Sequence, residues 1–289
     1  MQTSLLDARL SVGTVKVARR TLSSALSHAV TARHIPHNPV KDIRAPRYPD
    51  GQRPMLEPFT EEQARQLLTV CKDHPDATVA AFVTIGLMLG MRRGEILGLR
   101  LEDIDWAEGH LSISQALNQD YLPTVDGGWM TKLGTSTPKT RHSRRELSMP
   151  PSVRSALLRL QNTRNAQRQM AGANWEETGL LFCSKNGKPM WPSNLTKRYQ
   201  RLLKDAGVPK LSIHALRHTF ATICFLNEIP AEQVQTAAGH SSIRTTKDMY
   251  ANYIPQLATK AISALSEVLD PDTDQRHLEV VKIDERKGA

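Results

Sequence analysis

The stretch VAAFVTIGLMLGMRRGEIL, residues 79–97, places an almost wholly apolar segment directly before a cluster of charges. The apolar part, residues 79–89, is shorter than the roughly 20 residues that a membrane span takes, so it predicts a buried helix. Gly90 ends the apolar run, and the charged residues of the segment 92–95 follow it. We therefore expect these charged side chains to lie beside the hydrophobic core.

Upstream of this core helix, the sequence predicts another helix, a linker and an N-terminal helix. Thr60 and Gln63 form a capping-box pattern, which marks the start of a helix. The stretch RAPRYPDGQRP, residues 44–54, is rich in proline and poor in apolar residues, and it predicts an extended linker. From Ser11 to about His34, the spacing of apolar and basic residues predicts an amphipathic helix with a basic side.

Downstream, the pattern changes twice. Between His110 and Pro150, short alternating pieces such as LSIS and RELSM are separated by glycine-containing turns, which predicts a small antiparallel sheet. After Pro150, helical spacing returns and continues to about Leu269. The expected fold class is mainly α with a small antiparallel β-sheet, an α+β arrangement. The expected domains are a helical unit at 1–46, a linker at 47–57, a larger domain at 58–269 and an acidic tail at 270–289.

The charge balance favours a polyanionic partner, above all nucleic acid. The chain has 38 Lys and Arg against 29 Asp and Glu, a formal charge of +9 and a pI near 9.6. The excess is concentrated between residues 132 and 168, where Glu146 is the single acidic residue. Any one of these basic residues can instead belong to a solvated helix face. The candidate DNA contacts in this region and on the N-terminal helix are Arg19, Arg20, Lys132, Arg141, Arg144 and Arg145.

Several other classes of protein are disfavoured. The sequence lacks an apolar run of membrane-span length and a secretion signal at its start, so we expect a cytoplasmic protein that does not contact a membrane. Its cysteines are odd in number and far apart, which predicts neither disulfides nor a cysteine zinc site. It also lacks a GxxxxGK[ST] loop and a carboxylate cluster suited to two metal ions. We therefore expect no cofactor and no metal.

Residues that bind phosphate or transfer protons are concentrated in a few separated segments. These segments are GMRRGEIL at 90–97, TPKTRHSRR at 137–145, HALRHTFAT at 214–222 and GHSSIRTTKDMY at 239–250. Arg92 and Glu95 are three residues apart, as are His214 and Arg217, so on a helix each pair shares one face. His214 and His218 could pair on a metal, but no partner motif supports such a site.

In their order and spacing, these segments resemble the conserved boxes of the tyrosine recombinases of the phage integrase type. The resemblance extends from about Pro58 to Tyr253, and the segment from Ser11 to Pro46 is similar to the end of the family's core-binding domain. It implies that residues 1–46 are part of such a domain and that 58–269 is the catalytic domain. By position, it implies that the catalytic residues are Arg92, Lys139, His214, Arg217 and His240, with Tyr250 as the nucleophile and Glu95 in support.

The resemblance also implies an activity and partners. The expected protein is a site-specific recombinase that cuts and rejoins double-stranded DNA through a 3′-phosphotyrosine, for integration or excision of a phage or mobile element. It is expected to act as a homotetramer assembled on DNA, with accessory DNA-bending or directionality factors as further partners.

The chemistry of the candidate residues agrees with this reaction. Arg92 and Arg217 can each hold two phosphate oxygens through parallel N–H donors. Tyr250 has an ordinary pKa near 10 and needs a base, which can be His214 or His240. Lys139 is the candidate acid for the 5′-oxygen. Glu95 can orient Arg92 or His214, or interact only with a helix dipole.

Alternatives remain at several points. Lys132 competes with Lys139 as the acid, and Tyr253, one helical turn on, competes with Tyr250 as the nucleophile. A type IB topoisomerase would use the same nucleophile and most of the same residues. A noncatalytic regulator could use residues 230–250 as a helix-turn-helix with its turn at Gly239, but it would not need Arg92, Lys139 and Tyr250 together.

Overall fold

The computed structural model describes residues 9–48, 57–137 and 144–239. The chain separates into two compact units, Met1–Met55 and Leu56–Ala289. The described residues are mainly helical and include small antiparallel sheets, which confirms the predicted fold class. Among them, no helix is long and apolar enough to cross a membrane.

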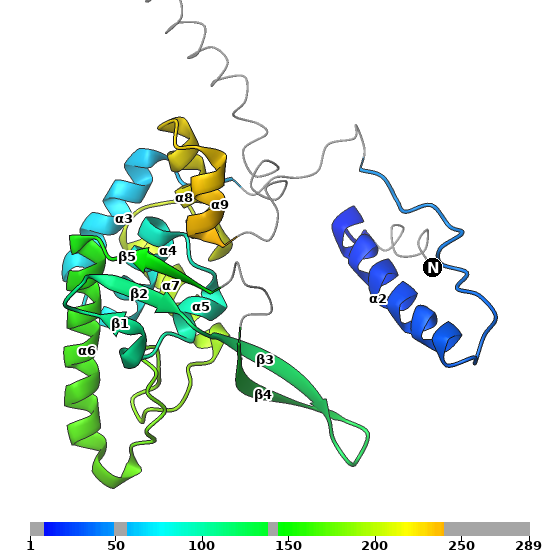
Figure 1. Ribbon diagram of the computed structural model, residues 1–289, viewed down its shortest axis with the longest axis horizontal. Coiled ribbons are helices and arrows are strands. Elements are labelled where there is room, and N and C mark those ends of the chain that lie inside the picture. Colours follow the sequence, from blue (N-terminus) through cyan, green and yellow to red (C-terminus); the bar gives the residue numbers. More distant parts are fainter. Residues whose placement is uncertain (1–8, 49–56, 138–143, 240–289) are drawn as a thin grey trace, which may run out of the picture. The chain divides into compact units, whose positions relative to one another are not determined.

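The first unit is built on helix α2, Val12–Thr31 (Figure 1). The helix begins at Ser11, whose side-chain oxygen accepts a hydrogen bond from the amide of Thr14 at 3.1 Å. Arg19 reaches the chain that follows α2, where its Nη2 donates to the carbonyls of Val40 at 2.7 Å and Ile43 at 2.6 Å. These bonds fold the segment after α2 back along the helix.

Helix α4, Ala77–Leu89, lies at the centre of the second unit. Every one of its residues except Met88 is buried, because the apolar side chains cover its whole circumference. This confirms the predicted buried helix. The helices packed around it are α3 (Glu61–Asp73), α6 (Pro151–Ala171), α7 (Pro192–Asp205) and α8 (His214–Leu226) (Figure 1).

The predicted capping box at the start of α3 is confirmed. The Thr60 hydroxyl accepts from the amide of Gln63 at 3.2 Å, and the Gln63 side chain accepts from the amide of Thr60 at 3.0 Å. Each partner thereby satisfies one orphan amide of the helix end. Helix α5, Arg93–Leu97, follows shortly after the end of α4 and positions the charged residues of the segment 92–95.

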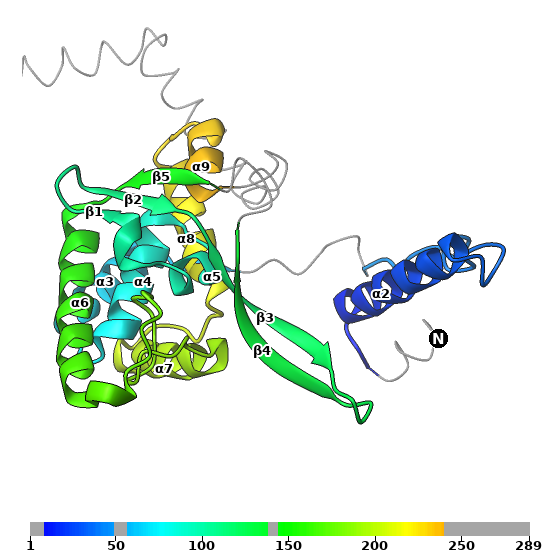
Figure 2. The ribbon, with the colours of Figure 1, turned by 60° about the horizontal axis from the view of Figure 1, so that its bottom comes forward.

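The strands form two separate sheets rather than the single sheet that we expected. Strands β1 (Ile104–Asp105), β2 (His110–Ile113) and β5 (Arg145–Ser148) pair in the order β1-β2-β5. Strands β3 (Ala116–Pro123) and β4 (Trp129–Ser136) form a hairpin that projects away from the helices (Figure 2). The sheets divide just after β2, where the Gln115 side chain donates to the Gly98 carbonyl at 2.8 Å.

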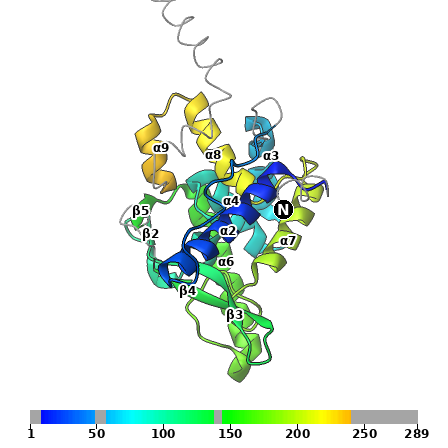
Figure 3. The ribbon, with the colours of Figure 1, turned by 90° about the vertical axis from the view of Figure 1, so that its right-hand side faces the viewer.

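The last described element of the chain is a short helix that packs against α8 and β5. Helix α9, Ala231–Ala238, lies beside α8 and next to β5 (Figure 3). Short 3-10 helices occur at Leu101–Asp103 and Gly172–Asn174.

Candidate active site

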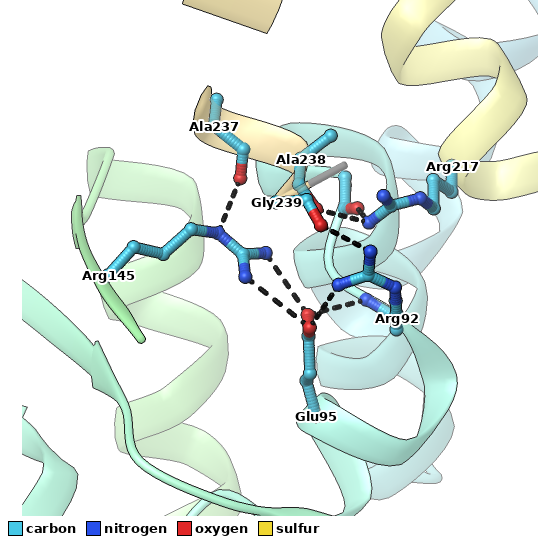
Figure 4. A network of polar contacts seen from close by, with 8 residues as sticks. Arg92, Glu95, Arg145, Arg217, Ala237, Ala238 and Gly239 are labelled. Atoms are coloured by element: carbon cyan, nitrogen blue, oxygen red, sulfur yellow. Dashed lines mark hydrogen bonds and ion pairs between the residues drawn. The ribbon is translucent and has the colours of Figure 1, made fainter. Parts of the chain in front are cut away.

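Three elements of the second unit bring charged side chains to the C-terminal end of α9 (Figure 4). Arg92 immediately precedes α5, Glu95 lies within α5, Arg217 comes from α8, and Arg145 begins β5. Arg145 and Arg217 are each separated from the rest of the group by dozens of positions in sequence. The fold therefore assembles one site from several of the segments that the sequence singled out.

Glu95 is the buried anion of this site. Its side chain is 4% exposed, and it accepts from the amide of Arg92 at 2.9 Å and from Arg92 Nη1 at 2.8 Å. Burial alone would raise the pKa of Glu95, but hydrogen bonds and charge from Arg145, with hydrogen bonds from Arg92, hold the pKa below its ordinary value. Glu95 thus holds Arg92 in place and lies in the first turn of α5.

The guanidinium of Arg92 is hydrogen-bonded on one side and exposed to solvent on another. Its Nη1 bonds Glu95, and its Nη2 donates to the carbonyl of Gly239. The Arg92 side chain is nevertheless 40% exposed. A guanidinium carries five N–H donors, so donors remain on its exposed side for an external anion.

Arg217 is more deeply placed. Its Nη1 donates to the carbonyls of Gly90 at 2.7 Å and Ala238 at 2.6 Å. Burial, followed by the charge of Arg92, lowers the pKa of the Arg217 guanidinium to about 9. Burial and the neighbouring positive charge both disfavour the charged form of this guanidinium. A bound phosphate would offset this effect.

The three arginines bind three successive carbonyls of the last turn of α9. Arg145 Nε donates to Ala237 at 2.8 Å, Arg217 donates to Ala238, and Arg92 donates to Gly239 (Figure 4). The last carbonyls of a helix lack partners within it and carry the negative end of its dipole. Guanidinium donors at these positions therefore stabilise the helix end while they are themselves fixed in place.

The histidines of α8 lie beside this cluster. His214 is exposed at the start of the helix. Partial desolvation of its imidazole, with the charges of Arg93 and Arg217, lowers the pKa of His214. Burial, with His214 and Arg217 nearby, also lowers the pKa of His218. His214 and His218 thus share the influence of the Arg217 charge. Both imidazoles are therefore favoured in the neutral form at pH 7.

The structure corrects one of the predicted DNA contacts, Arg145. Its side chain is 6% exposed, and its Nη2 lies 3.0 Å from Glu95 Oε2, so it is buried in the site rather than offered to DNA. The signal was present in the sequence, because residues two apart on a strand share a face. Arg145 therefore lies on the same face as the buried Leu147 and Met149.

The remaining predicted contacts fall into three groups. Arg20, Lys132 and Arg144 are exposed, as a contact with DNA requires. Arg19 is half-buried and gives hydrogen bonds to the loop after α2, so its main observed role is structural. The residues that lie outside the described part of the chain are Lys139, Arg141, His240 and Tyr250.

Part of the basic region between residues 132 and 168 serves the fold. Arg154 donates to the carbonyl of Trp106 at 2.7 Å, and the buried Arg164 donates to the carbonyl of Leu181 at 2.8 Å. Within residues 9–48, 57–137 and 144–239, no group of three His, Cys, Asp or Glu side chains is arranged to hold a metal ion.

Comparison with known proteins identifies related recombinases and integrases. A XerC-like tyrosine recombinase of Caldanaerobacter subterraneus is 30% identical over 261 residues, which are 88% of this chain and 66% of that protein. An integrase of Streptomyces ambofaciens is 27% identical, over 88% of this chain and 63% of its own length. The chain thus spans about two thirds of the length of these curated relatives.

Solved structures share the fold. The integrase of the Tn1549 transposon, in complex with a circular intermediate DNA, has a TM-score of 0.68 at 23% identity and covers 97% of this chain and 83% of its own. The XerA recombinase has a TM-score of 0.53 at 20% identity, over 88% of this chain and 78% of its own. Residues 57–256, more than half of the sequence, match the phage integrase family. The chain therefore belongs to the phage integrase family.

Proposed function

We propose that this protein is a site-specific DNA recombinase that integrates or excises a mobile element through a covalent phosphotyrosine. In the proposed reaction, Tyr250 Oη attacks a DNA phosphorus, an O–P bond forms, and the bond from phosphorus to the 5′-oxygen breaks. The tyrosine loses a proton and the departing 5′-oxygen gains one. Attack of another 5′-hydroxyl on the phosphotyrosine reverses these steps and joins the exchanged strands.

The observation that carries this proposal is the convergence of Arg92 and Arg217. They come from elements far apart in sequence, yet they bind the adjacent carbonyls of Gly239 and Ala238. Phosphoryl transfer requires stabilisation of charge on the nonbridging oxygens, and paired guanidiniums supply it. A regulator that only bound DNA would have no use for two partly buried guanidiniums fixed at one point.

Proton transfer is assigned to the histidines and a lysine. His214 has a lowered pKa, so at neutral pH its imidazole can accept the tyrosine proton or donate an N–H to a phosphate oxygen. His240 is the other candidate for these roles, and Lys139 is the proposed acid for the 5′-oxygen. The phosphotyrosine conserves the energy of the broken bond, so we expect the reaction to need no nucleotide cofactor.

The proposed substrate is double-stranded DNA that carries a specific recombination site. Relatives of known structure were solved with such DNA, including the Tn1549 integrase with its circular intermediate and a XerH recombinase with a palindromic site. We propose that this chain likewise acts as a homotetramer on DNA, with DNA-bending or directionality factors as further partners. The exposed Arg20, Lys132 and Arg144 are the proposed contacts with the DNA backbone.

The proposal is tested by covalent capture. Duplexes selected by the protein from a randomised pool are resynthesised with a nick moved base by base across the selected sequence. A nick close to the cleavage position lets the short fragment leave, so the protein–DNA adduct accumulates and is seen by denaturing electrophoresis. We expect Tyr250→Phe to abolish the adduct and to leave binding intact, while Tyr253→Phe retains both.

Three results would argue against the proposal. If the purified wild-type protein forms no adduct with any nicked duplex that it binds, the protein is not acting as a recombinase on that DNA. If it instead relaxes supercoiled plasmids that lack the selected sequence, a type IB topoisomerase activity replaces the proposed one. If Tyr253→Phe abolishes the adduct and Tyr250→Phe does not, the proposed nucleophile is wrong.

A further inference from the structure

We propose that Arg145 is a positioning residue of the active site, which acts on the reacting phosphate through Glu95 and Arg92 and through the end of α9. This inference rests on the proposed function. It gives a role in the reaction to a buried side chain that was first expected to contact DNA.

The contacts of Arg145 join two of the elements that make up the site. Its Nη2 lies 3.0 Å from Glu95 Oε2, its Nη1 lies 3.3 Å from Glu95 Oε1, and its Nε lies 2.8 Å from the carbonyl of Ala237. Both charged side chains are almost completely buried, with 6% of Arg145 and 4% of Glu95 exposed. A planar fork of donors is required to make all three bonds, and a lysine cannot reproduce it.

Arg145 reduces the share of the Glu95 charge that Arg92 has to compensate. A buried carboxylate is costly unless its charge is compensated. Glu95 has two guanidinium partners, so Arg145 carries part of that compensation and Arg92 can stay 40% exposed. Without Arg145, Glu95 would depend on Arg92 alone among the described residues. Arg92 would then be drawn toward the carboxylate and away from an incoming phosphate.

The contact of Arg145 with α9 also fixes the helix end that binds Arg92 and Arg217, the two arginines proposed to clamp the phosphate. The carbonyl that it binds belongs to Ala237, and the next two carbonyls bind Arg217 and Arg92. A shift of this helix end would therefore move the acceptors of both clamp residues together. Because a misplacement of about 1 Å can cost on the order of 10²-fold in rate, a modest shift is sufficient to impair catalysis.

The packing of Gly239 supports a close fit between Arg145 and the end of α9. A Cβ on this residue would meet the Arg145 guanidinium, with Cζ at 2.7 Å and Nε at 3.2 Å. Gly239 also has φ +68°, a left-handed conformation that favours glycine. The guanidinium of Arg145 therefore lies flush against the turn that ends α9 (Figure 4).

The test compares Arg145→Ala with a matched arginine elsewhere. Arg159, on α6, also caps a helix end, since it donates to the carbonyls of Cys71 at 3.0 Å and His74 at 2.7 Å after α3. It makes no contact with Arg92, Glu95 or Arg217 among the described residues. Loss of either arginine should lower the stability of the second unit, but only Arg145 should affect the chemistry.

The measurement is the single-turnover rate of adduct formation by the full chain at saturating selected duplex. We expect Arg145→Ala to slow this rate on the order of 10²-fold while DNA affinity stays close to that of the wild type. Arg159→Ala should keep the wild-type rate. Arg145→Lys, which retains the charge but not the fork, should fall between the wild type and Arg145→Ala.

A double variant identifies the route of the effect. Glu95→Gln and Arg145→Ala remove the same contact, so the combined loss should be close to the larger single loss rather than the product of the two. If Arg145→Ala fails to fold, Arg145→Lys and Glu95→Gln carry the same comparison. A folded Arg145→Ala with the wild-type rate, or losses that multiply, would overturn the inference. Absence of any adduct with the wild-type protein would instead count against the proposed function itself.

Discussion

A single methyl group added at Gly239 should uncouple Arg145 from the site, and its cost can be worked out from the geometry. The relevant control is Gly207, which also follows a helix and has φ +66°. A Cβ at Gly207 would meet only Gln66 Nε2 at 3.9 Å, an ordinary contact. Gly207→Ala therefore isolates the backbone cost of a left-handed alanine, about 1–2 kcal/mol.

Gly239→Ala carries the same backbone cost and a collision as well. The added carbon would lie 2.7 Å from Arg145 Cζ, so the guanidinium has to move away from Glu95 or from α9. Breaking a buried ion pair costs about 3–5 kcal/mol, because one charge is left uncompensated. We therefore expect Gly239→Ala to lose about 3–5 kcal/mol more than Gly207→Ala. This is a large part of the 5–15 kcal/mol that is typical of a domain.

Urea unfolding followed by tryptophan fluorescence measures this difference. The reporters all lie in the second unit, so the signal follows that unit alone: Trp106, Trp129, Trp175 and Trp191. In an Arg145→Ala background the collision partner is gone, and Gly239→Ala should cost no more than Gly207→Ala. Equal costs for Gly239→Ala with and without Arg145 would refute the reasoning.

Three further outcomes are expected from the structure. The pKa values of His214 and His218 lie below the ordinary 6.5, so the unfolded chain takes up protons first as pH falls. Stability is thus fully present above about pH 6.5 and is lost as pH falls through the folded values, which urea midpoints between about pH 7.5 and pH 5 would show; a flat profile contradicts it. Arg164→Ala should lower the free energy of unfolding by about 2–4 kcal/mol, because the Leu181 carbonyl and the Thr78 hydroxyl lose a buried donor, and an unchanged urea midpoint would argue against this. Binding of the selected duplex should weaken steeply with salt, as filter binding or anisotropy can measure, and a salt-independent affinity would exclude backbone phosphate contacts as its source.

The parts of the fold that could be predicted are those set by local patterns. The α4 helix follows from an apolar run with no polar interruption, and the start of α3 follows from the Thr60 and Gln63 capping pair. The division of the strands into two sheets was not predicted. Alternation identifies a strand, but it does not say which strand it pairs with. Just after β2, where the sheets divide, the Gln115 side chain donates to the carbonyl of Gly98, a contact that alternation does not predict.

The candidate site shows the same limit more sharply. Arg92 and Arg217 were predicted as site residues from spacing and resemblance, and the guanidinium of an arginine suits the binding of phosphate. Arg145 was misinterpreted because a basic region suggests contact with DNA, and charge counting does not distinguish exposed arginines from buried ones. The alternation of Arg145 with Leu147 and Met149 contained the needed information. A charged residue on the core face of a strand predicts a buried partner, here Glu95.

The arrangement at the end of α9 explains how a site crowded with positive charge can stay folded without a bound anion. Arg92, Arg145 and Arg217 repel one another, yet each donates to a carbonyl at the negative end of a helix, and Glu95 compensates two of them. The guanidiniums are therefore oriented without a ligand. An incoming phosphate meets donors that need little rearrangement, and this preorganisation is the condition under which electrostatic stabilisation of a transition state is most effective.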